Sequence, residues 1–185
     1  SPHYGEKHTV TFSLNDDEFL PANTSTTLEV NYGDVISLPI PTKEGYTFVG
    51  WFTGDTVNDG QWFNHTAVFD DITLFARFAL TEYTLPTSVK VVSGEKKTYH
   101  YGDVVTLEPV LNEGETFRKF TFSSVFFNQG VEHFTSTYSS NYQLKYILGK
   151  NTNLQVETFA TPTSTDGTEG TYIGELKNGD EILEF

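Results

Sequence analysis

One pattern occurs twice in this chain, and it constrains the fold more than any other feature. Tyr-Gly-Asp stands at residues 32–34 and again at 101–103, and an apolar segment follows each copy. In both copies a second glycine comes twelve positions after the first, and a large aromatic residue comes six positions later, Trp51 in one copy and Phe120 in the other. This equal spacing predicts two structural units built on one plan.

Composition and local pattern favour β-structure. Aromatic residues make up 15% of the 185 residues, and aromatic and β-branched side chains fit the pleated surface of a sheet. Residues 8–14 and 72–78 alternate between apolar and polar side chains, which is typical of strands with one buried face. No segment has the pattern of an amphipathic helix of three turns. We therefore predict a β-rich α+β fold of two small tandem mixed-sheet domains with little or no helix.

The repeat also predicts where the domains lie. The first spans residues 1–80 and the second residues 84–160, with a very short linker that limits their relative orientations. The second copy carries an insertion at 126–141. Residues 161–185 read as a polar linker followed by a hairpin, because Asn-Gly at 178–179 stands between two alternating segments.

Residues 45–52 are predicted to form the central strand of the first domain. Strict alternation would place Tyr46, Phe48 and Gly50 on one face, and Thr47, Val49 and Trp51 on the other, so we expect both faces to be covered at least in part. The second copy keeps the spacing of this segment but has Glu115 and Phe120 in place of Tyr46 and Trp51. The segment therefore indicates a place in a sheet rather than a binding strip.

Charge and cysteine content exclude several classes of function. The formal net charge is -14, with 11 basic residues and no run of them, so nucleic acid is not an expected partner. No apolar stretch approaches the roughly 18 residues of a membrane span. Without cysteine there are no disulfides, which fits a cytosolic protein or a surface protein that folds without them. The start Ser1-Pro2-His3 is typical of an excised fragment.

Residues 8–78 resemble the internalin-type B repeat, also called the Listeria–Bacteroides repeat. The resemblance rests on Tyr-Gly-Asp at 32–34, on Gly-Tyr-Thr-Phe-Val-Gly-Trp-Phe at 45–52, and on Ile-Thr-Leu-Phe-Ala-Arg-Phe at 72–78. It departs from the family pattern at residues 15–17 and at Phe78. Residues 87–159 are similar to a divergent form of the same family.

This resemblance implies a β-grasp (ubiquitin-like) fold, with the first and last strands adjacent and parallel, and an extracellular protein of the bacterial cell surface or cell wall. We expect a non-catalytic tandem module, acting as a spacer or stalk or as part of an adhesin. It would be monomeric and without cofactors, and its partners would be host or cell-surface proteins or glycans. Two alternatives stay open: a carbohydrate- or host-receptor-binding module that uses the insertion, and an accessory domain of a secreted enzyme.

The insertion supplies the best candidate for a ligand surface. Functional loops are often insertions on a rigid scaffold, and this one combines Ser and Thr with the candidate ligand residues Phe134, Tyr138, Asn141 and Tyr142. The alternative interpretation is an ordinary surface loop.

The remaining candidate residues favour structural roles. Trp51 and Trp62 could form a sugar platform, but small domains need such area in the core. The acidic residues Asp16, Asp17, Glu18, Asp70 and Asp71 lack the spacing of a calcium loop, and the histidines at 3, 8, 65, 100 and 133 lack that of a zinc site. No catalytic or metal-binding residues are predicted.

Overall fold

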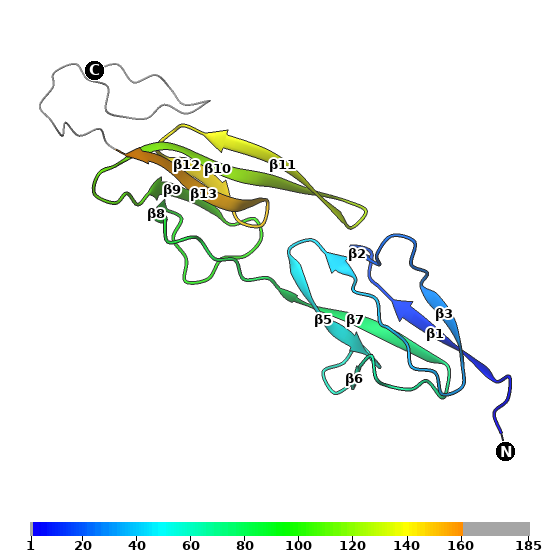
Figure 1. Ribbon diagram of the computed structural model, residues 1–185. Helices are drawn as coiled ribbons and strands as arrows, with labels where there is room; N and C mark the ends of the chain where they lie inside the picture. The colour runs from blue at the N-terminus through cyan, green and yellow to red at the C-terminus, as the bar shows by residue number, and fades with distance from the viewer. Residues whose placement is uncertain (1, 161–185) are drawn as a thin grey trace, which may run out of the picture.

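The computed structural model describes residues 2–160, which contain thirteen strands and no helix. The strands form two groups, and each group encloses a hydrophobic core of its own. We call strands β1–β7 the first unit and strands β8–β13 the second unit; they lie end to end (Figure 1). The predicted linker and hairpin at 161–185 lie outside the described residues.

The first unit is one mixed sheet. Its strands follow the order β2-β4-β5-β7-β1-β3, and the short β6 pairs with β5. β1 and β7 are parallel neighbours, as expected for the first and last strands, and the other pairs are antiparallel. The strands are β1 (Lys7–Ser13), β2 (Glu18–Phe19), β3 (Thr27–Asn31), β4 (Thr42–Lys43), β5 (Tyr46–Phe52), β6 (Gln61–Trp62) and β7 (Ile72–Leu80).

Trp51 lies in the core of the first unit. It is 1% exposed, and its ring centroid lies 4.9 Å from that of Phe12. The indole N–H donates to the backbone oxygen of Pro39 over 2.8 Å, so the polar atom of this buried ring is satisfied. Trp62 is half-buried against the same core. The structure therefore confirms the prediction that Trp51 is a core residue and not part of a sugar platform.

The predicted alternation of the central strand is wrong. A bulge interrupts the pairing of β5 with β7 between Phe48 and Gly50, and a bulge reverses the faces of the residues that follow it. Phe48 and Trp51 consequently pack together on the core side, with ring centroids 5.6 Å apart, whereas Val49 is exposed. Sequence alternation could not reveal this extra residue.

The second unit consists of two antiparallel three-stranded sheets, β11-β10-β13 and β12-β9-β8. We expected one mixed sheet here, and that expectation is wrong, because β8 and β13 are not paired. Phe120 of β10 and Leu107 of β9 are both fully buried in one core, so the two sheets pack against each other instead. The strands are β8 (Val89–Ser93), β9 (Val104–Pro109), β10 (Glu115–Asn128), β11 (Val131–Ser139), β12 (Leu144–Ile147) and β13 (Asn151–Ala160).

The repeated Tyr-Gly-Asp turn has the same structure in both units. At 33–34 the chain exchanges two backbone hydrogen bonds with Val68, of 2.7 and 2.8 Å, and at 102–103 it exchanges two with Leu148, both of 2.9 Å. In each turn the aspartate side chain accepts a hydrogen bond from the backbone N–H three residues earlier. Each glycine has φ near +86°, which favours glycine. The two units thus share a local plan as well as a spacing.

We expect Trp51→Ala to destabilise the first unit by about 3–5 kcal/mol, because it removes a large buried ring and leaves a cavity. Phe63→Ala, at an exposed aromatic residue of the same unit, should change stability far less. Trp62 remains as a fluorescent reporter of this unit in both variants, so denaturant titration followed by tryptophan emission compares them. Equal midpoints for Trp51→Ala and the unmodified chain would contradict the core assignment.

Candidate functional site

The insertion forms the end of a long hairpin rather than a surface loop. β10 continues to Asn128, and β11 returns from Val131 in unbroken antiparallel register. Gln129 and Gly130 both have positive φ, of 49° and 78°, as a two-residue type I′ turn requires. Figure 1 shows this hairpin extending from the second unit toward the first.

The hairpin tip, residues 128–131, contacts the first unit. The hydroxyl of Thr42 donates to the backbone oxygen of Gly130 over 3.0 Å. A Cβ atom at position 130 would overlap the Cβ of Phe19 and lie 2.9 Å from the Thr42 hydroxyl, so only glycine fits there. Beside this contact, residues of both units line a cleft of about 640 Å³. Its apolar floor includes Leu14, Leu20 and Val131.

A second contact between the units involves the tyrosine of the repeated turn. The Tyr101 ring covers Gly45, where an added Cβ would lie 2.8 Å from the tyrosine Cβ. Its hydroxyl donates to the carboxylate of Glu44. Burial, together with Glu44 as acceptor, raises the pKa of Tyr101. Residues 42–45 of the first unit therefore receive both the hairpin tip and this tyrosine.

The outer face of the sheet β11-β10-β13 carries a shallow groove of about 390 Å³. Tyr138, which is 65% exposed, lies on it beside Lys119, with the ammonium 4.8 Å from the ring centroid. Lys119 also lies 3.8 Å from the carboxylate of Glu157, which Arg118 approaches at 3.6 Å as well. Phe122 and a set of residues with hydroxyl or amide groups form the rest of the lining: Thr121, Ser123, Ser136, Thr137, Asn153 and Gln155.

The structure brings together part of the predicted ligand surface. Phe134 and Tyr138 point to the same face of β11, because they are four positions apart on one strand. Tyr142 lies elsewhere, with its ring edge-on to Phe117 at 5.6 Å, and the backbone N–H of Asn141 donates to Ser139. Sequence spacing missed the groove residues of β10 and β13, since only the strand register places them beside Tyr138.

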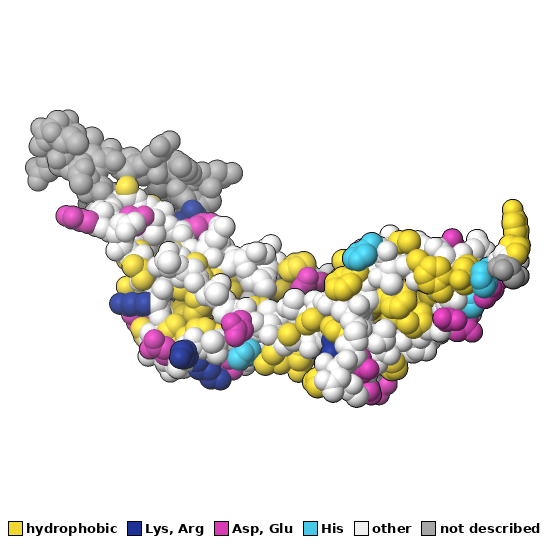
Figure 2. All heavy atoms as spheres, turned by 90° about the horizontal axis from the view of Figure 1, so that it is seen from below, with side chains coloured by type: hydrophobic (Ala, Val, Ile, Leu, Met, Phe, Trp, Pro, Cys, Tyr) yellow, Lys and Arg dark blue, Asp and Glu magenta, His cyan; other side chains and the backbone are white. Residues whose placement is uncertain are grey.

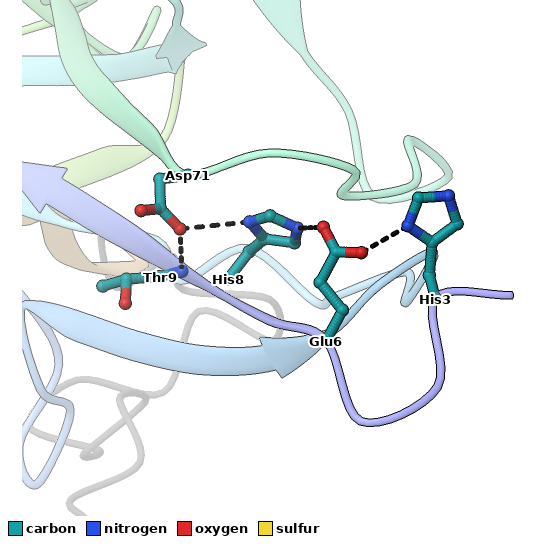
Figure 3. A network of polar contacts seen from close by, with 5 residues as sticks. All are labelled: His3, Glu6, His8, Thr9 and Asp71. Atoms are coloured by element: carbon teal, nitrogen blue, oxygen red, sulfur yellow. Dashed lines mark hydrogen bonds and ion pairs between the residues drawn. The ribbon is translucent and has the colours of Figure 1, made fainter. Parts of the chain in front are cut away.

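A network of polar contacts lies at the start of the first unit (Figure 3). The ring of His8 contacts the Glu6 carboxylate through Nε2 at 2.8 Å and the Asp71 carboxylate through Nδ1 at 3.2 Å. Asp71 also accepts a hydrogen bond from the backbone N–H of Thr9, and Glu6 pairs with His3. These contacts tie the segment before β1 to the start of β7.

The network depends on pH. Burial alone would lower the pKa of His8, but the two carboxylates outweigh it and raise that pKa. The hydrogen bond from His3 lowers the pKa of Glu6, and the Thr9 N–H lowers that of Asp71. A raised histidine pKa stabilises the fold below the ordinary value of 6.5, and lowered acid pKa values stabilise it above their ordinary 4.5 and 3.8. The network is therefore strongest between about pH 4.5 and 6.5.

Two of the other acidic candidates, Glu18 and Asp17, serve a turn and an ion pair. Glu18 is buried and accepts a hydrogen bond from the backbone N–H of Asn15 over 2.9 Å, and Asp17 lies 3.8 Å from Lys43. Within residues 2–160, no group of three or more such side chains is placed to hold a metal ion. Figure 2 shows hydrophobic patches on both units, and basic side chains mostly on the second unit, interspersed with acidic ones. This mixture does not favour binding to a phosphate backbone.

Comparison with known families finds a match for the first unit. Residues 8–77 match the family model of the Listeria-Bacteroides repeat domain. The chain is 38% identical over 79 residues to Internalin H of Listeria monocytogenes, which covers 40% of this chain and 14% of that protein. No helix long and apolar enough to cross a membrane occurs among the residues that the structure describes.

Two proteins of Evansella cellulosilytica are also similar. One, named "Putative membrane protein", is 31% identical over 90 residues, which is 48% of this chain and 13% of that protein. The other, named "Putative Gly-rich membrane protein", is 29% identical over 126 residues, which is 63% of this chain and 14% of that protein. The latter match is longer than the first unit and so reaches beyond it. The chain spans only about one seventh of these relatives, and no solved structure matches it.

We expect His8→Gln to reduce the pH dependence of stability in the first unit. The unmodified chain should lose the contribution of the network as the pH rises from 6 through the raised pKa of His8, whereas the variant has no such proton to lose. His65→Gln is the control, because among the described residues His65 pairs with no carboxylate. Urea midpoints followed by tryptophan emission at pH 6 and pH 8 make the comparison. An unchanged pH slope in His8→Gln would contradict the assigned role.

Proposed function

We propose, from the premise that residues 8–77 are a Listeria–Bacteroides repeat domain, that the chain is a non-catalytic tandem module of a bacterial surface protein. It acts as a spacer or stalk, or as part of an adhesin, outside the cell. Its small share of the length of its relatives supports a module within a longer protein. The observation that carries the proposal is the pair of contacts between the units.

We assign the same ancestry to the second unit, as a divergent copy with a modified β-grasp plan. The shared Tyr-Gly-Asp turn and its backbone hydrogen bonds support this assignment. So does the antiparallel pairing of β10 with β13, which corresponds to that of β5 with β7. The first hairpins differ, because β3 precedes its Tyr-Gly-Asp turn whereas β9 follows the second copy of that turn. Lost parallel pairing and an added hairpin distinguish this copy from the first.

The two contacts make the pair of units a stiff element. β7 ends at Leu80 and β8 begins at Val89, so the connection is short. A short connection limits translation, and two contacts between the units limit rotation as well. The insertion that distinguishes the second unit thereby acquires a structural role: its tip, at Gly130, holds the preceding unit in place. A spacer that carries such contacts projects its neighbours at a fixed distance and angle.

We expect Gly130→Ala to loosen the arrangement of the two units, because the new methyl group overlaps Phe19. Gly114→Ala is the matched control: the φ of Gly114 is +82°, but an added Cβ meets nothing within 4 Å among the residues that the structure describes. Since the chain has no cysteine, spin labels can be placed at exposed Val57 and Val110. Pulsed dipolar measurements should give a narrow distance distribution for the unmodified chain and Gly114→Ala, and a broad one for Gly130→Ala. A broad distribution in the unmodified chain would contradict the stiff-spacer proposal.

A second candidate function is the binding of a neutral glycan on the outer face of β11-β10-β13. The observation that favours it is the combination of an exposed Tyr138 with a lining of hydroxyl and amide groups. Aromatic faces pack against the apolar faces of sugar rings, and hydroxyl and amide groups both donate and accept hydrogen bonds. The net charge of -14 disfavours acidic glycans.

We expect Tyr138→Ala to weaken glycan binding about tenfold, which corresponds to about 1.4 kcal/mol. Phe126→Ala is the control, because Phe126 is an exposed aromatic residue on the other face of the same hairpin. An array of neutral and acidic oligosaccharides, followed by titration of any hit, supplies the measurement. Equal losses in both variants, or binding to acidic glycans alone, would contradict this function.

A further inference from the structure

The chain leaves both units in the same way. In the first unit the last paired residue, Leu80, lies opposite Tyr46, directly after the Glu44-Gly45 turn. In the second unit the last paired residue, Ala160, lies opposite Glu115, directly after a Glu-Gly turn at 113–114. In each unit, therefore, the last strand ends opposite the residue that directly follows a Glu-Gly turn.

At the first of these turns, the next unit returns and docks. Tyr101, from the Tyr-Gly-Asp turn of the second unit, covers Gly45 and donates its hydroxyl hydrogen bond to Glu44. Two features of position 45 favour glycine. Its φ is +82°, and an added Cβ would lie 2.8 Å from the Cβ of Tyr101. Gly45 is buried by this contact.

At the second turn, the described part of the chain supplies no residue in the place that Tyr101 takes at the first turn. Gly114 also has φ of +82°, but among residues 2–160 an added Cβ there would meet nothing within 4 Å, and both Glu113 and Gly114 are exposed. Glu113 thus offers an unburied carboxylate in the position where Glu44 accepts the tyrosine hydroxyl. The glycines of the two turns have the same φ, whereas the described residues that lie on the two turns differ.

We propose that the Glu113-Gly114 turn is a docking surface for the tyrosine of a Tyr-Gly-Asp turn in a unit that follows the second one. The inference rests on the proposed tandem function, and it specifies how successive units recognise each other. One rule then describes every junction: the tyrosine of each unit covers the Glu-Gly turn of the unit before it.

Two observations favour this occupant. The chain exits beside the turn, so a following unit is held close to it and needs little intrinsic affinity to dock. In addition, the matched relatives are about seven times longer than the matched segment, which leaves room for further units in such proteins. A small exposed turn with one carboxylate has too little apolar area to recruit an unrelated protein by itself.

The test uses the full chain with residues 81–160 inserted a second time after Ala160, ahead of residues 161–185. Spin labels at Val110 and at its counterpart in the added unit report the new junction, and labels at Val57 and the original Val110 report the existing one. We expect a narrow distance distribution at both junctions. Glu113→Gln and Gly114→Ala, each made in the original second unit only, should remove the narrow distribution at the new junction. Both variants should leave the distribution at the existing junction unchanged.

The outcomes separate this inference from the function on which it rests. A broad distribution at the new junction with a narrow one at the existing junction overturns the docking rule and leaves the stiff spacer intact. Broad distributions at both junctions overturn both. A narrow new junction that is insensitive to Glu113→Gln and to Gly114→Ala also overturns the rule, since docking would then use another surface. Glu113→Gln preserves the backbone, so loss of folding in Gly114→Ala would not prevent a decision.

Discussion

Both units depend on the short exchange of backbone hydrogen bonds between the Gly-Asp step of the repeated turn and one buried residue near the last strand. Val68 in the first unit and Leu148 in the second occupy this position, and both are almost completely buried. The exchange connects the first hairpin of each unit to the segment that leads into its last strand. In the second unit, where β8 and β13 do not pair, it provides a backbone link between the two sheets.

Much of the fold could be predicted from sequence, because spacing and alternation are recorded residue by residue. The alternation of residues 8–14 predicted a strand with one buried face, and Val10 and Phe12 of β1 are buried. The equal spacing predicted two units on one plan, and the turns at 33–34 and 102–103 make the same backbone hydrogen bonds. Pairing between distant strands could not be predicted in the same way. The bulge at Val49 and the separation of β8 from β13 depend on how whole strands pack, and no local pattern carries that information.

The candidate surfaces were less predictable than the fold, for a related reason. The composition of the insertion predicted a ligand surface. Its tip instead carries Gly130, which packs against Phe19, a residue more than one hundred positions away in the sequence. Tyr101 looked like one member of a structural motif, and the structure uses its ring to cover Gly45. In both cases the sequence shows the residue type, whereas the residue that it contacts in the other unit is known only from the three-dimensional structure.

The pairing of β1 with β7 has a consequence for a protein under tension. The chain enters the first unit at β1 and leaves it at β7, and these strands are parallel neighbours joined over four residue pairs. A force that pulls the two ends apart therefore acts along the strands and loads those pairs together, in shear. In the second unit the corresponding strands, β8 and β13, lie in different sheets. The same force must pass there through side-chain packing and the link at Leu148, so the two units bear load by different paths.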